Sequence, residues 1–127
     1  MSPYQRPVRF TWWLGNRAYT LFVIRELTSV FIAAYAVLLL LLLRSLSAGR
    51  EAYAAYLQFL TAPGMIIFNL VALAAAVFHA VTWFDLAPKG IAVRMGDRPL
   101  PGRIIVAANY AAWIVVSAMI AWIVLGV

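Results

Sequence analysis

The polar side chains inside long apolar stretches are the ones that could do chemistry. Arg25 and Glu26 are adjacent near the start of the first stretch. His79, the one histidine of the chain, lies in the second stretch, and Trp83 follows it by four residues. A carboxylate and an imidazole can exchange protons, and an indole provides an aromatic wall with a hydrogen-bond donor. These residue types suit an amphipathic aromatic ligand that releases protons.

Each of these residues also has a purely structural interpretation. Arg25 and Glu26 can form an ion pair at a helix end. His79 can make an interhelical hydrogen bond, or it can be one axial ligand of a haem whose second ligand comes from a partner. Trp83 can be an anchor at the membrane interface, as can Trp12 and Trp13. Residue types alone leave these interpretations open.

The composition decides the class of protein. Of 127 residues, 66% are hydrophobic and 11% are charged, against roughly 45–50% and 25% in soluble domains. A soluble fold of this size could not bury so many apolar side chains, which excludes a water-soluble globular enzyme. The absence of cysteine excludes disulfides and thiolate-ligated metal sites or iron–sulfur clusters within this chain. The net charge of +6 does not indicate nucleic-acid binding, because the basic residues lie at the ends of apolar stretches.

Charge-free runs locate three membrane-spanning helices. A helix that crosses ~30 Å of hydrocarbon needs about 20 residues. Pro63 suits the first turn of a helix, where its missing N–H costs nothing, and Pro88 is expected to stop that helix. The predicted spans are Tyr19–Arg44, Pro63–Ala87 and Ile104–Leu125. The whole chain is thus predicted to be one transmembrane domain of an all-α membrane protein.

Positive charges predict the orientation, because cytoplasmic loops of membrane proteins are enriched in Lys and Arg. The N-terminal region and the second loop hold most of the basic residues, namely Arg6, Arg9, Arg17, Arg25, Lys89, Arg94, Arg98 and Arg103. The first loop holds Arg44 and Arg50, and the C-terminus holds none. The N-terminus and the second loop are therefore predicted to be cytoplasmic, and the first loop and the C-terminus to lie outside.

Helical spacing predicts an amphipathic helix and two helix faces that pack against protein. A short amphipathic helix on the outer membrane face is predicted from Tyr53, Tyr56, Leu57 and Leu60. Small and polar residues share one stripe of the second span and avoid lipid by facing protein: Asn69, Ala72, Ala76, His79 and Trp83. The third span has a similar stripe at Ala107, Ala111, Ala118 and Ala121. We therefore expect partner subunits or self-association.

The predicted spans place the residues that could do chemistry at similar depths in the membrane. Arg25 and Glu26 lie about 9–10 Å inside the first helix, and His79 lies ~13 Å from the cytoplasmic end of the second. Trp83 is one turn closer to the cytoplasm than His79. The four residues can therefore form a polar pocket in the cytoplasmic third of the membrane. Quinone chemistry, in which two electrons and two protons leave together, fits such a pocket.

Several short motifs occur in a recognisable order. They are Arg6-Pro7, Thr11-Trp12-Trp13, Arg25-Glu26, Asn69-Leu70, Leu73-Ala74-Ala75-Ala76 and the run Phe78-His79-Ala80-Val81-Thr82-Trp83-Phe84-Asp85-Leu86-Ala87-Pro88-Lys89. This order resembles the membrane-anchoring C subunit of fumarate reductases over nearly the whole chain. The resemblance is strongest in the last run, and it weakens in Met95–Arg103 and in the third span.

The resemblance implies three transmembrane helices that pair with a second small membrane anchor, the D subunit, as half of a six-helix anchor. The two anchors would hold a flavoprotein subunit and an iron–sulfur subunit on the cytoplasmic face of the bacterial cytoplasmic membrane. Such a complex oxidises menaquinol and reduces fumarate in anaerobic respiration. FAD and the iron–sulfur clusters would belong to the partner subunits, and no haem is expected.

The resemblance also implies a set of menaquinol-binding positions. The matching residues are Arg25, Glu26, His79 and Trp83. We predict that Glu26 and His79 take part in proton transfer. One alternative is a haem b-containing cytochrome anchor of succinate dehydrogenase, which would show a Soret band. Another alternative is a small non-redox membrane interaction protein, which would purify without flavin or iron–sulfur partners.

Overall fold

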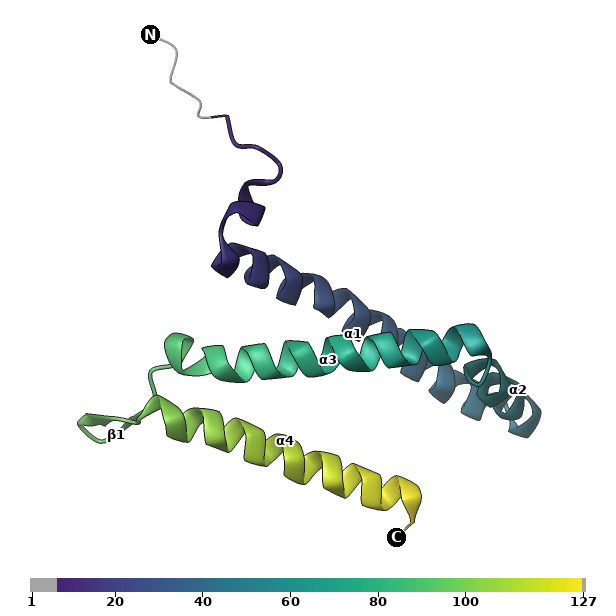
Figure 1. Cartoon of the computed structure of the whole chain (residues 1–127). Helices are drawn as coiled ribbons and strands as arrows, with labels where there is room; N and C mark the ends of the chain where they lie inside the picture. The colour runs from purple at the N-terminus through teal and green to yellow at the C-terminus, as the bar shows by residue number, and fades with distance from the viewer. Residues whose placement is uncertain (1–6, 127) are drawn as a thin grey trace. The chain divides into compact units, whose positions relative to one another are not determined.

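The computed structural model describes residues 7–126, and Arg6, one of the charges used to predict the orientation, lies outside the described residues. The elements are shown in Figure 1. In chain order they are the 3-10 helix η1 (Trp12–Gly15), α1 (Arg17–Ser47), α2 (Arg50–Leu60), α3 (Pro63–Gly90), the strands β1 (Arg94–Met95) and β2 (Arg98–Pro99), and α4 (Gly102–Leu125).

Three helices of the described chain are long and apolar enough to cross a membrane, with 31 residues in α1, 28 in α3 and 24 in α4. This finding confirms the predicted all-α membrane protein with three spans. At 1.5 Å per residue, α1 is about 46 Å long and exceeds the hydrocarbon thickness. Its ends therefore extend toward the headgroup region unless the helix tilts. The orientation and the single-domain organisation remain predictions.

The prediction that Pro88 stops the second span is wrong. Helix α3 continues to Gly90, with Pro88 inside its last turn. Proline lacks the N–H that would bond to the carbonyl of Phe84, but it leaves the next hydrogen bonds intact. The N–H of Ile91 still donates to the carbonyl of Ala87 at 2.9 Å. The loss is confined to one hydrogen bond near the helix end, so the helix continues past the proline.

Asn16 determines where α1 begins. Its backbone is extended, and its side-chain oxygen accepts a first-turn N–H of α1 at 2.9 Å. The hydroxyl of Thr20 donates to the carbonyl of Trp13 at 2.8 Å, which holds η1 against the start of α1. The rings of Trp12 and Tyr19 pack edge to face, with centroids 5.2 Å apart. Aromatic residues therefore stand beside the first turn of α1.

The chain divides into two compact units, and the boundary on α3 falls after His79. In the first unit, the rings of Phe31 on α1 and Phe68 on α3 lie 6.4 Å apart between centroids. Helix α2 is the short helix predicted in the first loop. Its Tyr56 hydroxyl donates to the carbonyl of Leu38 at 2.8 Å, which ties α2 to α1.

The second unit contains the end of α3, the β1–β2 hairpin and α4. Phe84 packs edge to face against Tyr110 and Trp113, with centroids 5.2 and 5.8 Å apart. The Tyr110 hydroxyl donates to a carboxylate oxygen of Asp85 at 3.3 Å. The hairpin reverses at Gly96, whose φ of +64° favours glycine. The antiparallel register pairs Arg94 with Pro99 and Met95 with Arg98.

The helices cover little of their own surface. Of residues 7–126, two are buried: Ala72 is 4% exposed and Arg25 is 8% exposed. Membrane helices do not need a core of their own, because lipid tails are as apolar as their side chains. The exposed apolar surface therefore faces lipid or partner subunits.

We expect Gly102→Ala to destabilise the second unit. A Cβ added at Gly102 would lie 2.9 Å from the Cβ of Pro88, whose ring cannot rotate away. Overpacking of this kind costs about 1–3 kcal/mol. The thermal unfolding midpoint of the detergent-solubilised chain measures the effect. Gly64→Ala is the control, because it also lies in the first turn of a helix but has open space around it. Equal midpoints for the two variants would contradict the close approach of Pro88.

Candidate functional site

Among residues 7–79, the one charged residue that is buried is Arg25. It is 8% exposed, although it lies on a helix that is apolar enough to span a membrane. Its guanidinium carbon lies 5.4 Å from the centre of the Phe22 ring, within the range of a cation–π contact. Its Nε lies 3.9 Å from Oε1 of Glu26. The guanidinium is therefore partnered by an aromatic face and a carboxylate on the same helix.

Glu26 has the opposite environment. Its side chain is 48% exposed, against 10% for the side chain of Arg25. The long stem of an arginine can carry its charge toward the membrane surface, yet Arg25 is the side chain that turns inward. The carboxylate lies at the surface of α1, nine residues after its first residue, Arg17. In the assembled protein, a ligand, a partner or water has to solvate it.

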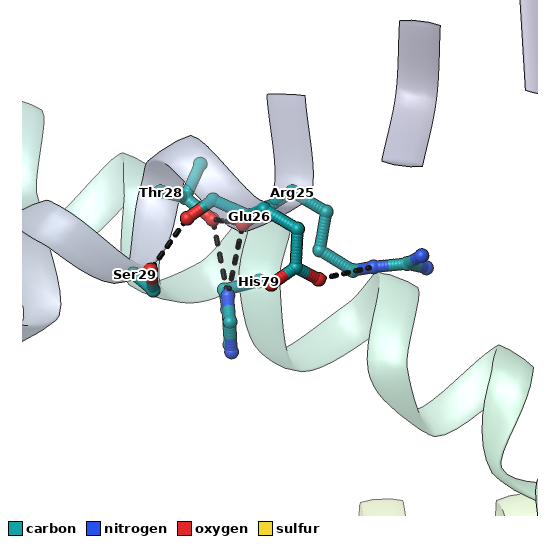
Figure 2. A network of polar contacts seen from close by, with 5 residues as sticks. All are labelled: Arg25, Glu26, Thr28, Ser29 and His79. Atoms are coloured by element: carbon teal, nitrogen blue, oxygen red, sulfur yellow. Dashed lines mark hydrogen bonds and ion pairs between the residues drawn. The ribbon is translucent and has the colours of Figure 1, made fainter. Parts of the chain in front are cut away.

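His79 connects α3 to α1 at this level. Its Nδ1 lies 3.1 Å from the hydroxyl oxygen of Thr28 and 3.3 Å from the backbone carbonyl oxygen of Arg25. The Thr28 hydroxyl also lies 2.5 Å from the same carbonyl. Figure 2 shows the imidazole directed toward both oxygen atoms. The structure therefore brings His79 together with Arg25, and with Glu26 as the next residue of α1.

The small-residue stripe of α3 borders a groove further along the first unit. The groove has a volume of about 420 Å³ and runs between α1 and α3. Its lining is mostly apolar and consists of Ile32, Tyr35, Ile66, Asn69, Leu70, Ala72, Leu73 and Ala76. The side-chain oxygen of Asn69 is buried and has no hydrogen-bond partner in the described chain. The stripe thus makes a concave surface of the kind that helix packing uses.

Comparison with known proteins identifies the family. A family model for the C subunit of fumarate reductase matches residues 1–125. The chain belongs to that family. The corresponding C subunit of Mycobacterium tuberculosis is 41% identical over 125 residues, which cover 98% of this chain and 99% of that one. Those of Vibrio cholerae and Aliivibrio fischeri are 35% and 34% identical over 119 residues, or 94% of this chain and 94% of each relative.

Family membership fixes the coarse role of the chain. Together with its three apolar helices, it makes the chain a multi-pass membrane protein that serves as an anchor subunit of a fumarate reductase complex. The sequence resemblance is thereby confirmed. Large exposed apolar surfaces are what such a subunit presents to lipid and to the rest of its complex.

Trp83 is the predicted site residue that belongs to the second unit, and it is 42% exposed. It follows His79 by four residues on the continuous helix α3, so the two residues lie on the same stripe of that helix. Its assignment to a binding pocket therefore rests on helical spacing.

Thr28 is the residue that sequence reasoning missed. A threonine inside a helix commonly bonds to a carbonyl of its own preceding turn, and Thr28 does so with Arg25. Its second contact, with His79 on α3, is what joins it to the site. Arg25 and Thr28 are three residues apart and therefore lie on one face of α1. That spacing is the sequence feature from which Thr28 could have been predicted as part of the site.

The cluster supplies groups for binding and proton transfer. It combines a carboxylate, a guanidinium and an imidazole within one level of α1 and α3. Within residues 7–126, no three His, Cys, Asp or Glu residues gather in a way that could hold a metal ion. The chemistry that these side chains offer is hydrogen bonding to a polar ligand and the acceptance of protons.

We expect a thiol at position 26 of the isolated chain to be far more reactive than one at position 72. Because the chain has no cysteine, Glu26→Cys and Ala72→Cys each carry a single thiol. Side chain 26 is exposed, whereas Ala72 is 4% exposed and reacts only when the structure opens. N-ethylmaleimide should therefore modify Glu26→Cys about tenfold faster or more in detergent. Similar rates would contradict the surface position of Glu26.

Proposed function

We propose that this chain forms part of a menaquinol oxidation site in which Glu26 receives a proton from the substrate. The observation that carries the proposal is the half-exposed Glu26 carboxylate beside the buried Arg25 guanidinium, with 3.9 Å between Nε and Oε1. An exposed carboxylate in an apolar helix is costly unless a polar group solvates it. A menaquinol hydroxyl is a donor of that kind.

The electrons and protons of the reaction take different routes in this proposal. Oxidation of one menaquinol releases two electrons and two protons. The electrons would pass one at a time through the iron–sulfur clusters of one partner subunit to the flavin of the flavoprotein subunit, where fumarate would take up two electrons and two protons to become succinate. The Glu26 carboxylate accepts a quinol proton and relays it toward the cytoplasm. The Arg25 guanidinium balances the charge of the carboxylate and contacts a quinone oxygen.

His79 and Trp83 complete the proposed site on α3. His79 assists proton transfer or orients the quinol ring, which is consistent with its Nδ1 lying 3.3 Å from the Arg25 carbonyl oxygen. Trp83 forms an aromatic wall one turn away on the same helix stripe. An indole suits this role because its ring packs against an aromatic ligand and its N–H can donate a hydrogen bond.

The partners in this proposal are a second membrane anchor (the D subunit), a flavoprotein subunit and an iron–sulfur subunit. The second anchor would pack against the unburied helix faces of this chain. FAD and the iron–sulfur clusters reside in the soluble subunits, in keeping with the absence of cysteine here. The soluble subunits bind on the cytoplasmic side, where the N-terminus and the β1–β2 hairpin are proposed to lie.

Replacement of Glu26 by Gln tests the proton-acceptor role. Glu26→Gln keeps the shape of the side chain but removes its basic oxygen, so menaquinol-dependent fumarate reduction should fall by roughly 100-fold. Fumarate reduction by a reduced viologen dye, which bypasses the quinol, should stay unchanged in the same purified complex. Glu51→Gln, at an exposed carboxylate of α2, is the control and should retain quinol activity. Normal quinol activity in an assembled Glu26→Gln complex would reject the role.

Single cysteines test the orientation. Ala48→Cys lies in the turn between α1 and α2, and Asp97→Cys lies in the β1–β2 hairpin; both positions are exposed. In intact spheroplasts, a membrane-impermeant maleimide should label Ala48→Cys and leave Asp97→Cys unlabelled until the membrane is permeabilised. The opposite labelling pattern would invert the proposed topology and move the hairpin away from the soluble subunits.

A further inference from the structure

Two oxygen atoms near His79 determine which ring nitrogen carries its proton. Nδ1 lies 3.1 Å from the Thr28 hydroxyl oxygen and 3.3 Å from the Arg25 carbonyl oxygen. A carbonyl oxygen only accepts hydrogen bonds, so the contact with Arg25 requires a hydrogen on Nδ1. A neutral imidazole carries one N–H, and its other nitrogen then holds a lone pair. In the neutral ring, Nε2 is therefore the basic atom.

The Thr28 hydroxyl fits the same assignment. Its single hydrogen is directed to the Arg25 carbonyl, 2.5 Å away within the same helix. The hydroxyl oxygen is then an acceptor toward His79, and Nδ1–H is the donor. If Nδ1 instead held the lone pair, it would face the lone pairs of the Arg25 carbonyl. With Nδ1–H as the donor, the contacts of Nδ1 with the Thr28 hydroxyl and the Arg25 carbonyl and the bond of Thr28 to that carbonyl are all satisfied. With the opposite tautomer, at most one of the two contacts of Nδ1 is a hydrogen bond.

We propose that Thr28 is a positioning residue that, with the Arg25 carbonyl, holds His79 in the Nδ1–H tautomer and so makes Nε2 its proton-accepting atom. Figure 2 shows Nδ1 directed at both oxygens, while the second ring nitrogen lies on the side of the ring away from them. The ring cannot turn over without giving up both contacts. Nothing in the sequence pattern alone assigns this role to Thr28.

The assignment deepens the proposed function and rests on it for its chemical meaning. When menaquinol is oxidised, Nε2 takes one of its two protons, and the two electrons would leave one at a time to the iron–sulfur clusters of a partner subunit. The imidazole becomes an imidazolium with a hydrogen on each nitrogen. Its Nδ1–H keeps the same two oxygen acceptors, which stabilise the positive charge without rearrangement. Thr28 therefore acts through His79 and does not touch the substrate.

The tautomer can be measured without any substrate. The chain contains one histidine, so the full-length chain labelled with 13C,15N-histidine in lipid bilayers gives one imidazole spin system by solid-state NMR. We expect the proton on Nδ1 in the wild type and in Thr28→Ser. Thr28→Val keeps the shape but loses the hydroxyl, and the tautomer ratio should shift roughly two- to tenfold toward Nε2–H. A wild-type ring protonated on Nε2, or a Thr28→Val spectrum identical to wild type, would overturn the assignment.

The consequence for turnover is measured in the assembled complex. Thr28→Val should lower kcat for menaquinol oxidation roughly two- to tenfold with little change in KM, and Thr28→Ser should restore it. Ser29→Ala is the matched control, because its hydroxyl also bonds a carbonyl of its own helix, that of Glu26. Equal losses in Ser29→Ala and Thr28→Val would reduce Thr28 to a local structural role and reject the positioning.

The two measurements separate failure of this inference from failure of the proposed function. If His79→Ala kept normal quinol kinetics while the wild-type NMR spectrum gave the Nδ1–H form, the proton-transfer role of His79 would be rejected and the tautomer assignment supported. If His79→Ala lost quinol activity while the wild-type ring carried its proton on Nε2, the proposed function would be supported and the role of Thr28 rejected.

Discussion

A polar side chain in a membrane helix has to find its partners within protein, because hydrocarbon offers none. The contact between His79 and the two oxygen atoms of α1 meets this requirement and is the link on which the site depends. In lipid, burial of apolar surface between helices contributes little to their association. Side-chain contacts such as this one therefore contribute more to the packing of helices than in a soluble protein. The Phe31–Phe68 contact adds a second, apolar level to the same pair of helices. Together they set the level of α3 against α1 and therefore the level of His79 against Arg25.

The same constraint explains why this membrane anchor buries so few of its own side chains as a single chain. Two of its described residues are buried, and one of those is a charged arginine. The Glu26 side chain stays half-exposed and the mostly apolar groove stays open. The buried side-chain oxygen of Asn69 has no hydrogen-bond partner in the described chain. An anchor subunit in a complex presents such surfaces to lipid and to other subunits.

Arg25 and Glu26 differ in burial, with the arginine side chain buried and the glutamate side chain half-exposed. Arginine keeps its charge under nearly all conditions and can stack on an aromatic ring, so it tolerates an enclosed position above Phe22. The proton-acceptor role proposed for Glu26 would require access to a ligand instead, and the Glu26 side chain is 48% exposed. The pair thus combines a fixed positive charge inside with a titratable group at the surface. This arrangement suits proton chemistry better than two equally buried charges would.

The sequence by itself determined the membrane class, the three spans, the short helix of the first loop and the family, because these follow from composition, apolar length and motif order. It also identified Arg25, Glu26 and His79 as the costly polar groups, since each interrupts an apolar helix. Only the tertiary structure decided that Arg25 turns inward while Glu26 stays exposed, that Thr28 meets His79, and that α3 continues past Pro88. Helical periodicity says which residues share a face, but the rotation of that face toward a neighbouring helix depends on packing between distant parts of the chain. For the same reason, the tautomer of His79 is set by oxygen atoms more than fifty residues away in sequence.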